Sequence, residues 1–297
     1  MPQAVEVLSV IFPVFSIIAI GYLFASFKKI ELDSIMEVLL YVTIPALVIS
    51  SLARKDIVVG DLTSVALAAA GVVAGTALIS RAYLSATNPV GDRRGLRGFY
   101  LSTMFMNSGN LTLPIALLAF GSEGLAAAVL YYVAISIYVY TLGIYVAKGS
   151  GGLGEIFKLP LLYATAIGIA INLTGTELPG PVLVTFDMLG AATIPLMQIS
   201  LGYQLYSVKL SDYTLAAAAS AIRIGGGLAA AYIMVTLLGI EGVTRKVVLL
   251  SSAMPSAVIN FVLSVRYNVE SEFVASTVAM STLISVITIP LLLAWLM

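Results

Sequence analysis

Two stretches decide the fold of this chain: Met106-Asn-Ser-Gly-Asn-Leu-Thr-Leu-Pro114 and Ala253-Met-Pro-Ser-Ala-Val-Ile-Asn260. Each places Asn, Ser and Pro in the middle of an apolar segment of about 20 residues, the length that a membrane-crossing helix needs. Pro removes a backbone donor, so the helix should break at both places. Freed backbone groups at membrane depth persist only when they are buried in protein or line a cavity. The stretches therefore predict two interrupted helices around a central site.

The composition around these stretches is that of an integral membrane protein. The chain has 297 residues, of which 60% are hydrophobic and 10% charged, and its net charge is zero. A soluble domain has about 25% charged residues. The chain contains no Cys and no His, which excludes thiolate and histidine metal sites, Ser-His triads and histidine proton relays. Zero net charge argues against nucleic-acid binding, and we expect no cofactor and no metal.

Ten apolar segments are long enough to cross a membrane, and the loops between them are short. Lys and Arg orient these segments, because cytoplasmic loops carry the excess of positive charge. The loops after odd-numbered spans carry ten Lys and Arg, against four on the other side (Arg54, Lys55, Arg245 and Lys246). We therefore expect a multi-pass protein of the plasma membrane with both termini outside the cell. The predicted spans are 5–26, 34–53, 62–84, 97–119, 123–147, 159–174, 181–206, 213–238, 245–266 and 271–296.

The two halves of the sequence resemble each other. Thr43-Ile-Pro-Ala-Leu-Val-Ile-Ser50 matches Thr193-Ile-Pro-Leu-Met-Gln-Ile-Ser200 at five of eight positions. Each half holds five predicted spans, an odd number, so the halves must enter the membrane from opposite sides. Inverted repeats of this kind are typical of secondary transporters. We predict an all-α membrane fold of ten transmembrane helices in two inverted repeats, residues 1–148 and 159–297, joined by a cytoplasmic linker at 149–158.

The interruptions fall in corresponding spans of the two halves, which points to a transporter binding site. Two half-helix N-termini facing each other would offer partial positive charge to an anion, and amide side chains would add donors. Alternatively, the Asn side chains only cap broken helices or join neighbouring spans. The candidate substrate-binding residues in these stretches are Asn107, Ser108, Asn110, Pro114, Pro255, Ser256 and Asn260.

Other polar residues at membrane depth are further candidates. Arg223 lies near the centre of the eighth span, where a charge is costly and faces the protein interior. It could neutralise the carbonyl ends of the broken helices, the role we favour, or pair with a substrate carboxylate. Glu37 and Asp187, near the starts of spans two and seven, either favour the helix dipole or couple an ion. Gln198 is a third candidate for ion coupling, and Gln198 and Gln204 of span seven could face a pore or a dimer partner.

The interrupted spans resemble those of the auxin efflux carrier family. The likeness covers the whole chain and is most specific in Ala253-Met-Pro-Ser-Ala-Val-Ile-Asn-Phe-Val-Leu-Ser-Val-Arg-Tyr-Asn268; the closing Thr288-Ile-Pro-Leu-Leu292 is also similar. This resemblance, and the wider bile-acid-transporter-like superfamily, implies that broken helices four and nine cross. It also implies a scaffold of spans one, two, six and seven that forms a homodimer, and a moving transport domain of spans three to five and eight to ten.

The resemblance also implies a substrate class. Family substrates are carboxylate-bearing organic anions such as auxin or dicarboxylates, and in plant members an Asn in each broken helix holds the carboxylate. Asn107 matches the position in span four by its distance to Pro114, whereas Asn260 falls where plant members carry the crossover proline. We therefore expect a secondary transporter that exports small carboxylates by elevator-type alternating access, with H+ or Na+ as a possible coupling ion.

Three other functions compete with this hypothesis. A sodium-coupled importer of organic anions, of the bile-acid-transporter type, is the alternative within transport, and a passive channel is another. An intramembrane hydrolase is disfavoured, because a serine enzyme of that kind needs His and an aspartyl protease needs two facing Asp, whereas only Asp187 lies near membrane depth. We therefore do not expect an enzyme.

Overall fold

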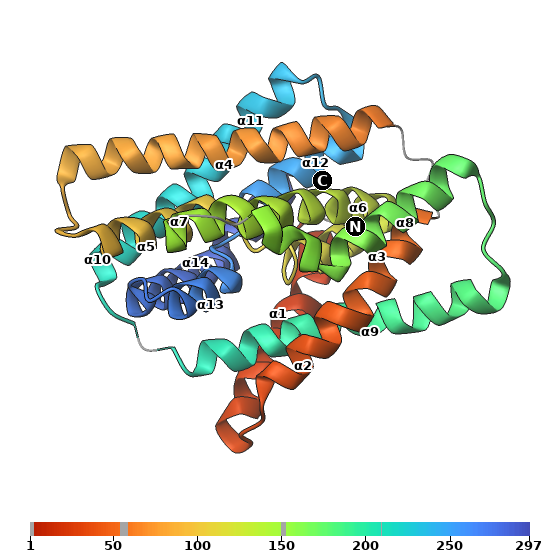
Figure 1. Cartoon of the computed structure of the whole chain (residues 1–297), viewed down its shortest axis with the longest axis horizontal. Helices are drawn as coiled ribbons and strands as arrows, with labels where there is room; N and C mark the ends of the chain where they lie inside the picture. The colour runs from red at the N-terminus through yellow and green to blue at the C-terminus, as the bar shows by residue number, and fades with distance from the viewer. Residues whose placement is uncertain (1–2, 54–58, 150–152, 209) are drawn as a thin grey trace.

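The computed structural model describes residues 3–53, 59–149, 153–208 and 210–297, which form helices joined by short loops (Figure 1). Arg54, Lys55 and Lys209, which enter the count of positive charges, and residues 150–152 of the predicted linker lie outside the described residues. The helices are α1 Gln3–Phe27, α2 Leu32–Val38, η1 Leu39–Thr43, α3 Ile44–Ala53, α4 Val59–Thr87, α5 Arg93–Met104, α6 Thr112–Tyr138, η2 Val139–Gly143, α7 Ile144–Lys148, η3 Leu153–Lys158, α8 Pro160–Thr174, α9 Gly180–Tyr206, α10 Tyr213–Ala221, η4 Ile222–Gly226, α11 Gly227–Leu237, α12 Gly242–Ser252, α13 Val258–Arg266 and α14 Ser271–Leu296.

Seven helical stretches in the described part of the chain are long and apolar enough to cross a membrane. This confirms an all-α, multi-pass membrane protein. The other three predicted spans are not single helices long and apolar enough to cross a membrane, and the reasons are physical. Span six is the shorter apolar helix Pro160–Thr174, and spans four and nine are divided by their interruptions. The ten-span inverted repeat therefore stays a prediction.

The stretch Thr112–Lys148 combines two predicted spans. Its 37 residues would extend about 55 Å as one straight helix, well beyond a hydrocarbon core of about 30 Å. The chain bends at Gly121, whose φ of +67° and ψ of −156° are non-helical. An L side chain rarely adopts this conformation, which is why glycine occupies the bend. The second half of span four thus ends at the bend, and span five begins there.

The helix ends extend beyond the predicted spans, because apolarity locates the membrane and not the end of a helix. The fourth span was predicted to begin at residue 97, but α5 begins at Arg93. Asp92 caps this helix, since its side chain accepts a hydrogen bond from the Gly95 amide at 2.8 Å. A capped polar first turn therefore precedes the apolar part of α5.

Helices α1, α3, α8 and α9 pack against one another through glycines. A Cβ at Gly21 would overlap the carbonyl oxygen of Ile199, and a Cβ at Gly202 would overlap that of Ile18. A Cβ at Gly190 would lie 2.9 Å from the Leu47 Cα. The backbones of these helices therefore approach as closely as small residues permit. We call α1, α2, η1, α3, α8 and α9 the first helix group.

The remaining helices form a second helix group, α4 to α7 and α10 to α14. Within it α4 packs on α11, α6 on α12, and α10 on α14. In Figure 1, α4 and α11 lie along one edge of the molecule, and α1, α2 and α9 lie along the opposite edge. The division coincides with the scaffold and transport spans implied by the family resemblance, but the packing alone does not test whether the groups move separately.

Both predicted interruptions are present, and they cross. Residues 105–111 separate α5 from α6, and residues 253–257 separate α12 from α13. The Asn107 amide donates to the Pro255 carbonyl at 2.8 Å, and the Ala257 amide donates to the Phe105 carbonyl at 3.1 Å. These bonds form an antiparallel β-bridge between Met106 and Ser256. Each interruption thus satisfies backbone groups that the other has freed, as burial in the membrane requires.

Arg223 binds the C-terminal ends of the two helices that stop at the crossing, α5 and α12. Its Nη1 donates to the carbonyls of Thr103 (2.6 Å) and Met104 (2.9 Å), and its Nη2 donates to the Ser252 carbonyl (2.9 Å). These are the last carbonyls of α5 and α12, and the Arg223 side chain is fully buried. Each helix C-terminus carries about −0.5 charge, so one guanidinium balances the two. The geometry matches the favoured role of neutralising the ends of the broken helices.

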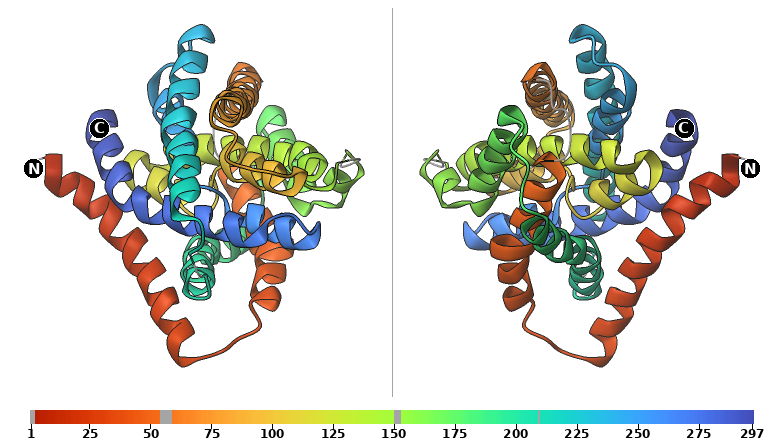
Figure 2. Two further views of the ribbon diagram at one scale, coloured as in Figure 1. Left: turned by 90° about the vertical axis from the view of Figure 1, so that its left-hand side faces the viewer. Right: turned by 90° about the vertical axis from the view of Figure 1, so that its right-hand side faces the viewer.

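The two chain ends lie together. The Gln3 side chain at the start of α1 donates to the Ala294 carbonyl near the end of α14, and Figure 2 shows the two ends on the same side of the molecule. An even number of membrane crossings requires this arrangement. Which side of the membrane they face stays a prediction.

Replacing Arg223 tests its role in the crossing. In Arg223→Leu the last carbonyls of α5 and α12 lose their charged donor, and each unsatisfied buried group costs about 1–3 kcal/mol. The melting temperature in detergent should fall with and without ligand, and Arg223→Lys, which keeps the charge, should fall less. A Leu variant that melts like the wild type would contradict this role.

Replacing Gly202 tests the packing of the first helix group. In Gly202→Ala the added methyl meets the Ile18 carbonyl, and the resulting strain should destabilise the protein by about 1–3 kcal/mol. Gly180→Ala is the matched control on the same helix, because a Cβ there meets nothing within 4 Å. Thermal melting should separate the two variants, and equal melting temperatures would show that α1 and α9 can move apart without cost.

Candidate functional site

A cavity of about 620 Å³ opens beside the crossing. We call it the crossing cavity. The first helix group lines it with residues of α2, η1, the start of α3 and the second half of α9, including Glu37, Ile44 and Met197. The second group lines it with residues 106–110 of the interruption and with residues of α6, η2, α13 and α14. The cavity therefore lies between the two helix groups.

Two helix N-termini border the crossing cavity. Helix α6 begins at Thr112 and α13 at Val258, and in neither does a side chain cap the first turn. The residues just before these helices, 107–110 and Ala257, line the cavity. Each N-terminus carries about +0.5 charge on amide groups that lack helical partners. The cavity thus presents partial positive charge of about one unit from the two helix ends.

Asn107 is the polar side chain best placed to meet a ligand. Its Oδ1 accepts a hydrogen bond from the Asn110 amide at 3.2 Å, which fixes the orientation of the side-chain amide. Its Nδ2 is buried and has no hydrogen-bond partner among the described residues. Because Asn107 lines the cavity, Nδ2 is a donor that a bound acceptor could satisfy.

The walls of the crossing cavity are largely apolar, with Leu39, Ile44, Val139 and Val262 among the lining residues. The charged residues that line it are Asp33 and Glu37, and no Lys or Arg is found among its lining residues in the described part of the chain. A ligand therefore meets helix dipoles and polar side chains at the crossing, mostly apolar walls elsewhere, and the carboxylates of Asp33 and Glu37.

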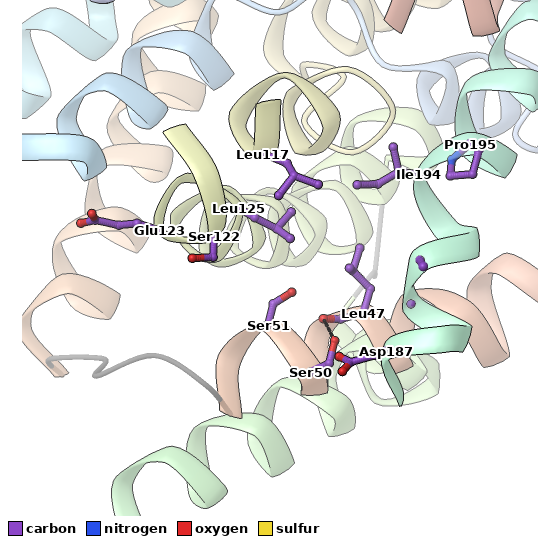
Figure 3. A pocket seen from close by; sticks show the side chains of 12 residues that line it. Leu47, Ser50, Ser51, Leu117, Ser122, Glu123, Leu125, Asp187, Ile194 and Pro195 are labelled. Carbon is purple, nitrogen blue, oxygen red and sulfur yellow. Dashed lines mark hydrogen bonds between the residues drawn. The ribbon is translucent and has the colours of Figure 1, made fainter. Parts of the chain in front are cut away.

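A second cavity, of about 710 Å³, lies at the other end of the same helices. We call it the serine pocket, after Ser50, Ser51 and Ser122, which line it. Figure 3 shows Asp187 beside Ser50 on one side of the pocket and Glu123 on the opposite side, with Leu117 and Leu125 between them. The Ser50 hydroxyl donates to the Leu47 carbonyl at 3.2 Å.

The two cavities are separated by the proline segments of the sequence repeat. On α3 the crossing cavity reaches Ile44 and the serine pocket begins at Leu47; on α9 the serine pocket ends at Pro195 and the crossing cavity begins at Met197. Since α3 and α9 both run from one cavity to the other, the cavities face opposite ends of the helix bundle. Residues 44–47 and 195–197 form the barrier between them.

The predicted site residues divide into three sets. Asn107, Ser108 and Asn110 line the crossing cavity together with Glu37, whereas Asp187 lines the serine pocket. Pro114, Pro255, Ser256, Asn260, Arg223 and Gln198 are buried and line neither cavity.

Two members of the third set, Asn260 and Ser256, support the crossing from behind. The Asn260 Nδ2 donates to the Phe105 carbonyl at 2.9 Å and to the Ser256 hydroxyl at 3.0 Å, while the Ser256 amide donates to the Ser281 hydroxyl at 3.0 Å. The Asn260 donor is therefore engaged within the protein, in line with the alternative that this Asn joins broken helices. Gln198 is 1% exposed, and neither of its amide atoms has a partner among the described residues.

Ser200 was not among the sequence candidates, whereas Gln204 was predicted to face a pore or a dimer partner. Both lie on α9 and line the crossing cavity. Ser200 closes the repeat segment that ends at Ser50 in the first half, and this correspondence was the available signal. Gln204 follows Ser200 by four residues and so lies on the same helix face.

Comparison with known proteins agrees with this architecture. Residues 152–293 match the family described as membrane transport protein. The chain is 30% identical over 273 residues to an uncharacterised transporter of Methanothermobacter thermautotrophicus, covering 88% of each chain. It is also 32% identical over 206 residues to an uncharacterised transporter of Methanocaldococcus jannaschii, covering 66% of this chain and 67% of that one. These matches confirm a transporter and not an enzyme, and the chain belongs to the auxin efflux carrier family of membrane transporters.

Proposed function

We propose that the protein carries a small monocarboxylate with an apolar body across the membrane by alternating access. The observation that supports this most directly is the crossing cavity. It has two uncapped helix N-termini at one end, together with the Asn107 Nδ2, which has no partner among the described residues, and most of its other lining residues are apolar. These donors suit one carboxylate group, and the apolar walls suit the rest of the molecule.

The charges of the cavity favour one carboxylate over two. The pair of N-termini supplies about one positive charge in total, which a single carboxylate balances. A second carboxylate would meet Asp33 or Glu37 and would find no cationic side chain among the lining residues. Desolvating an unpaired charge is costly. Within the predicted class of carboxylates, the site therefore favours monocarboxylates over dicarboxylates.

The arrangement of the cavities supports alternating access. The crossing cavity and the serine pocket share α3 and α9 as one wall and residues of the second helix group as the other. A shift of the second group along α3 and α9 would carry the crossing past the barrier and open it toward the serine pocket. We propose that spans one, two, six and seven stay as a dimeric scaffold and that the ten spans form two inverted repeats, 1–148 and 159–297.

The distribution of Lys and Arg over the loops suggests from which side of the membrane the substrate enters. The crossing cavity lies at the end of the molecule that holds the 28–31 loop, with Lys28 and Lys29. By the distribution of Lys and Arg this end faces the cytoplasm, so both termini face outward across the plasma membrane. We propose export, with the substrate entering at the crossing cavity and leaving at the serine pocket.

Exchanging the amide of Asn107 for a carboxylate tests the anion site. In Asn107→Asp an oxygen still accepts from the Asn110 amide, but the unpartnered donor becomes an anion that occupies the positive end of the cavity itself. We expect carboxylate binding to weaken by at least about 1–3 kcal/mol, the cost of a lost donor, while the melting temperature of the empty protein holds or rises.

Calorimetric titration of the purified protein with monocarboxylates measures the effect. The control is Asn88→Asp, the same chemical change on an exposed loop residue. Wild-type affinity in Asn107→Asp would remove Asn107 from the site.

Locking the two helix groups together tests the mechanism. Gly109 of the crossing faces Met197 of α9, since a Cβ on Gly109 would lie 2.7 Å from the Met197 Cε. The chain has no Cys, so Gly109→Cys with Met197→Cys places two thiols across the boundary. A short bifunctional thiol reagent that forms reducible disulfides then joins them. Liposomes holding this variant should take up a labelled monocarboxylate only after reduction, and each single variant should be indifferent to reductant.

Three results would redirect this proposal. Full uptake with the cross-link closed would reject movement of one group against the other. Flux that does not saturate would favour a channel. Strict dependence on sodium would favour the sodium-coupled importer.

A further inference from the structure

A cluster of one cation and two aromatic rings lies on the surface of the second helix group, and its residues line neither cavity. The guanidinium carbon of Arg245, in α12, lies 5.6 Å from the centre of the Tyr232 ring of α11. The Tyr232 ring lies 6.5 Å from the ring of Trp295, near the end of α14. Tyr232 is 49% exposed and Trp295 is 59% exposed. We call Tyr232, Arg245 and Trp295 the surface cluster.

An exposed apolar ridge of α14 leads to the surface cluster. Leu283, Ile287 and Leu291 are between 61% and 67% exposed, and they precede Trp295 at intervals of four residues. Side chains at this interval form a continuous ridge along a helix, here about 18 Å long. Such a ridge on a membrane helix contacts acyl chains, and Trp and Tyr are enriched where acyl chains meet headgroups. The ridge and the cluster therefore follow the length of a lipid from its chain to its headgroup.

The guanidinium of Arg245 is half-buried and has no carboxylate partner among the described residues. Glu241, the acid four residues earlier on the chain, is exposed and forms no ion pair with it. The contact with the Tyr232 ring orients the guanidinium but does not neutralise its charge. A guanidinium presents its N–H groups as a fork that matches two oxygens of a phosphate. The cluster thus offers a positioned phosphate ligand at the headgroup end of the ridge.

The next residue of α12 is also a cation, but it lies against a different helix. The Lys246 ammonium is 5.7 Å from the centre of the Phe120 ring of α6. Consecutive residues of a helix are turned by about 100° about its axis, so the two cations leave α12 in different directions. Arg245 is the one linked through Tyr232 to the ridge of α14. The pair therefore separates the effect of this cluster from the effect of positive charge as such.

We propose that the surface cluster binds the headgroup phosphate of an anionic phospholipid, one acyl chain of which lies along the ridge of α14. A free phosphate ion would contact Arg245 but leave the ridge unused, so the ridge favours the lipid. A zwitterionic lipid carries an ammonium group that competes with Arg245 for its own phosphate, so the anionic headgroup is preferred. The bound lipid would contact α11, α12 and α14, all of the second helix group, and this inference uses neither cavity.

Trp295 gives a local readout, because it is the only tryptophan of the chain. The full-length protein would be reconstituted into phosphatidylcholine vesicles that contain brominated phosphatidylglycerol or brominated phosphatidylcholine, since bromine quenches tryptophan fluorescence on contact. The quenching should show about 5-fold preference for phosphatidylglycerol, the factor that one basic side chain supplies at a membrane surface. Arg245→Gln should abolish this preference, and Arg245→Lys should keep most of it. Lys246→Gln is the matched control, which removes the same charge from the next residue and should keep the preference.

Four results would overturn the proposal. Equal quenching by the two brominated lipids would show no preference for an anionic headgroup, and weak quenching by both would show that protein, such as a second copy of the chain, covers Trp295. Equal loss of preference in Arg245→Gln and Lys246→Gln would assign it to the net charge of this end. Loss of the preference on adding inorganic phosphate at constant ionic strength would assign the site to the free ion. Unchanged melting temperatures show that the variants are folded, and if Arg245→Gln unfolds, the comparison of Arg245→Lys with Lys246→Gln decides.

Discussion

The structure depends on the contact between the Arg223 guanidinium and the last carbonyls of α5 and α12. Breaking two helices at membrane depth exposes two negative C-terminal ends and two positive N-terminal ends. Arg223 balances the negative pair with hydrogen bonds to the carbonyls of Thr103, Met104 and Ser252, and the β-bridge between the interruptions satisfies the backbone amides of Asn107 and Ala257. The positive pair is then the part of the crossing left without a compensating charge, and it borders the cavity. The proposed preference for an anion rests on this arrangement.

Much of this could be predicted from residue types alone. Pro and Asn inside apolar segments locate the interruptions, because few sequences tolerate such residues at membrane depth unless the helix breaks there. A single Arg in the eighth span has to find buried acceptors, and the ends of broken helices are the strongest available. The repeat of Thr43–Ser50 and Thr193–Ser200 marks the two segments that separate the cavities. The first two of these inferences rest on the free-energy cost of an unsatisfied polar or charged group, which is large inside a membrane.

The choice between Asn107 and Asn260 could not be predicted, because side-chain directions follow a fixed period only in regular helices. The interruption around Asn107 is not helical, so spacing does not say where the side chain points. Asn260 lies in the first turn of α13, and its Nδ2 donates to Phe105 across the crossing, a partner distant in sequence. The hydrogen bonding of Ser200 was hidden for a related reason. A serine in a helix usually bonds to a carbonyl of the preceding turn, as Ser50 does, whereas the Ser200 hydroxyl has no partner among the described residues.

The location of Arg223 also bears on how a site of this kind could move. Arg223 and both interruptions belong to the second helix group, whereas the barrier segments of α3 and α9 belong to the first. A relative displacement of the groups would leave the balanced charges and the β-bridge intact, because all the partners travel together. The contacts that change would include those between lining residues, those between a bound substrate and the first group, and the hydrogen bond from Gln3 of α1 to the Ala294 carbonyl of α14. Apolar contacts have little directionality, so the charged crossing can remain rigid while the largely apolar boundary around it shifts.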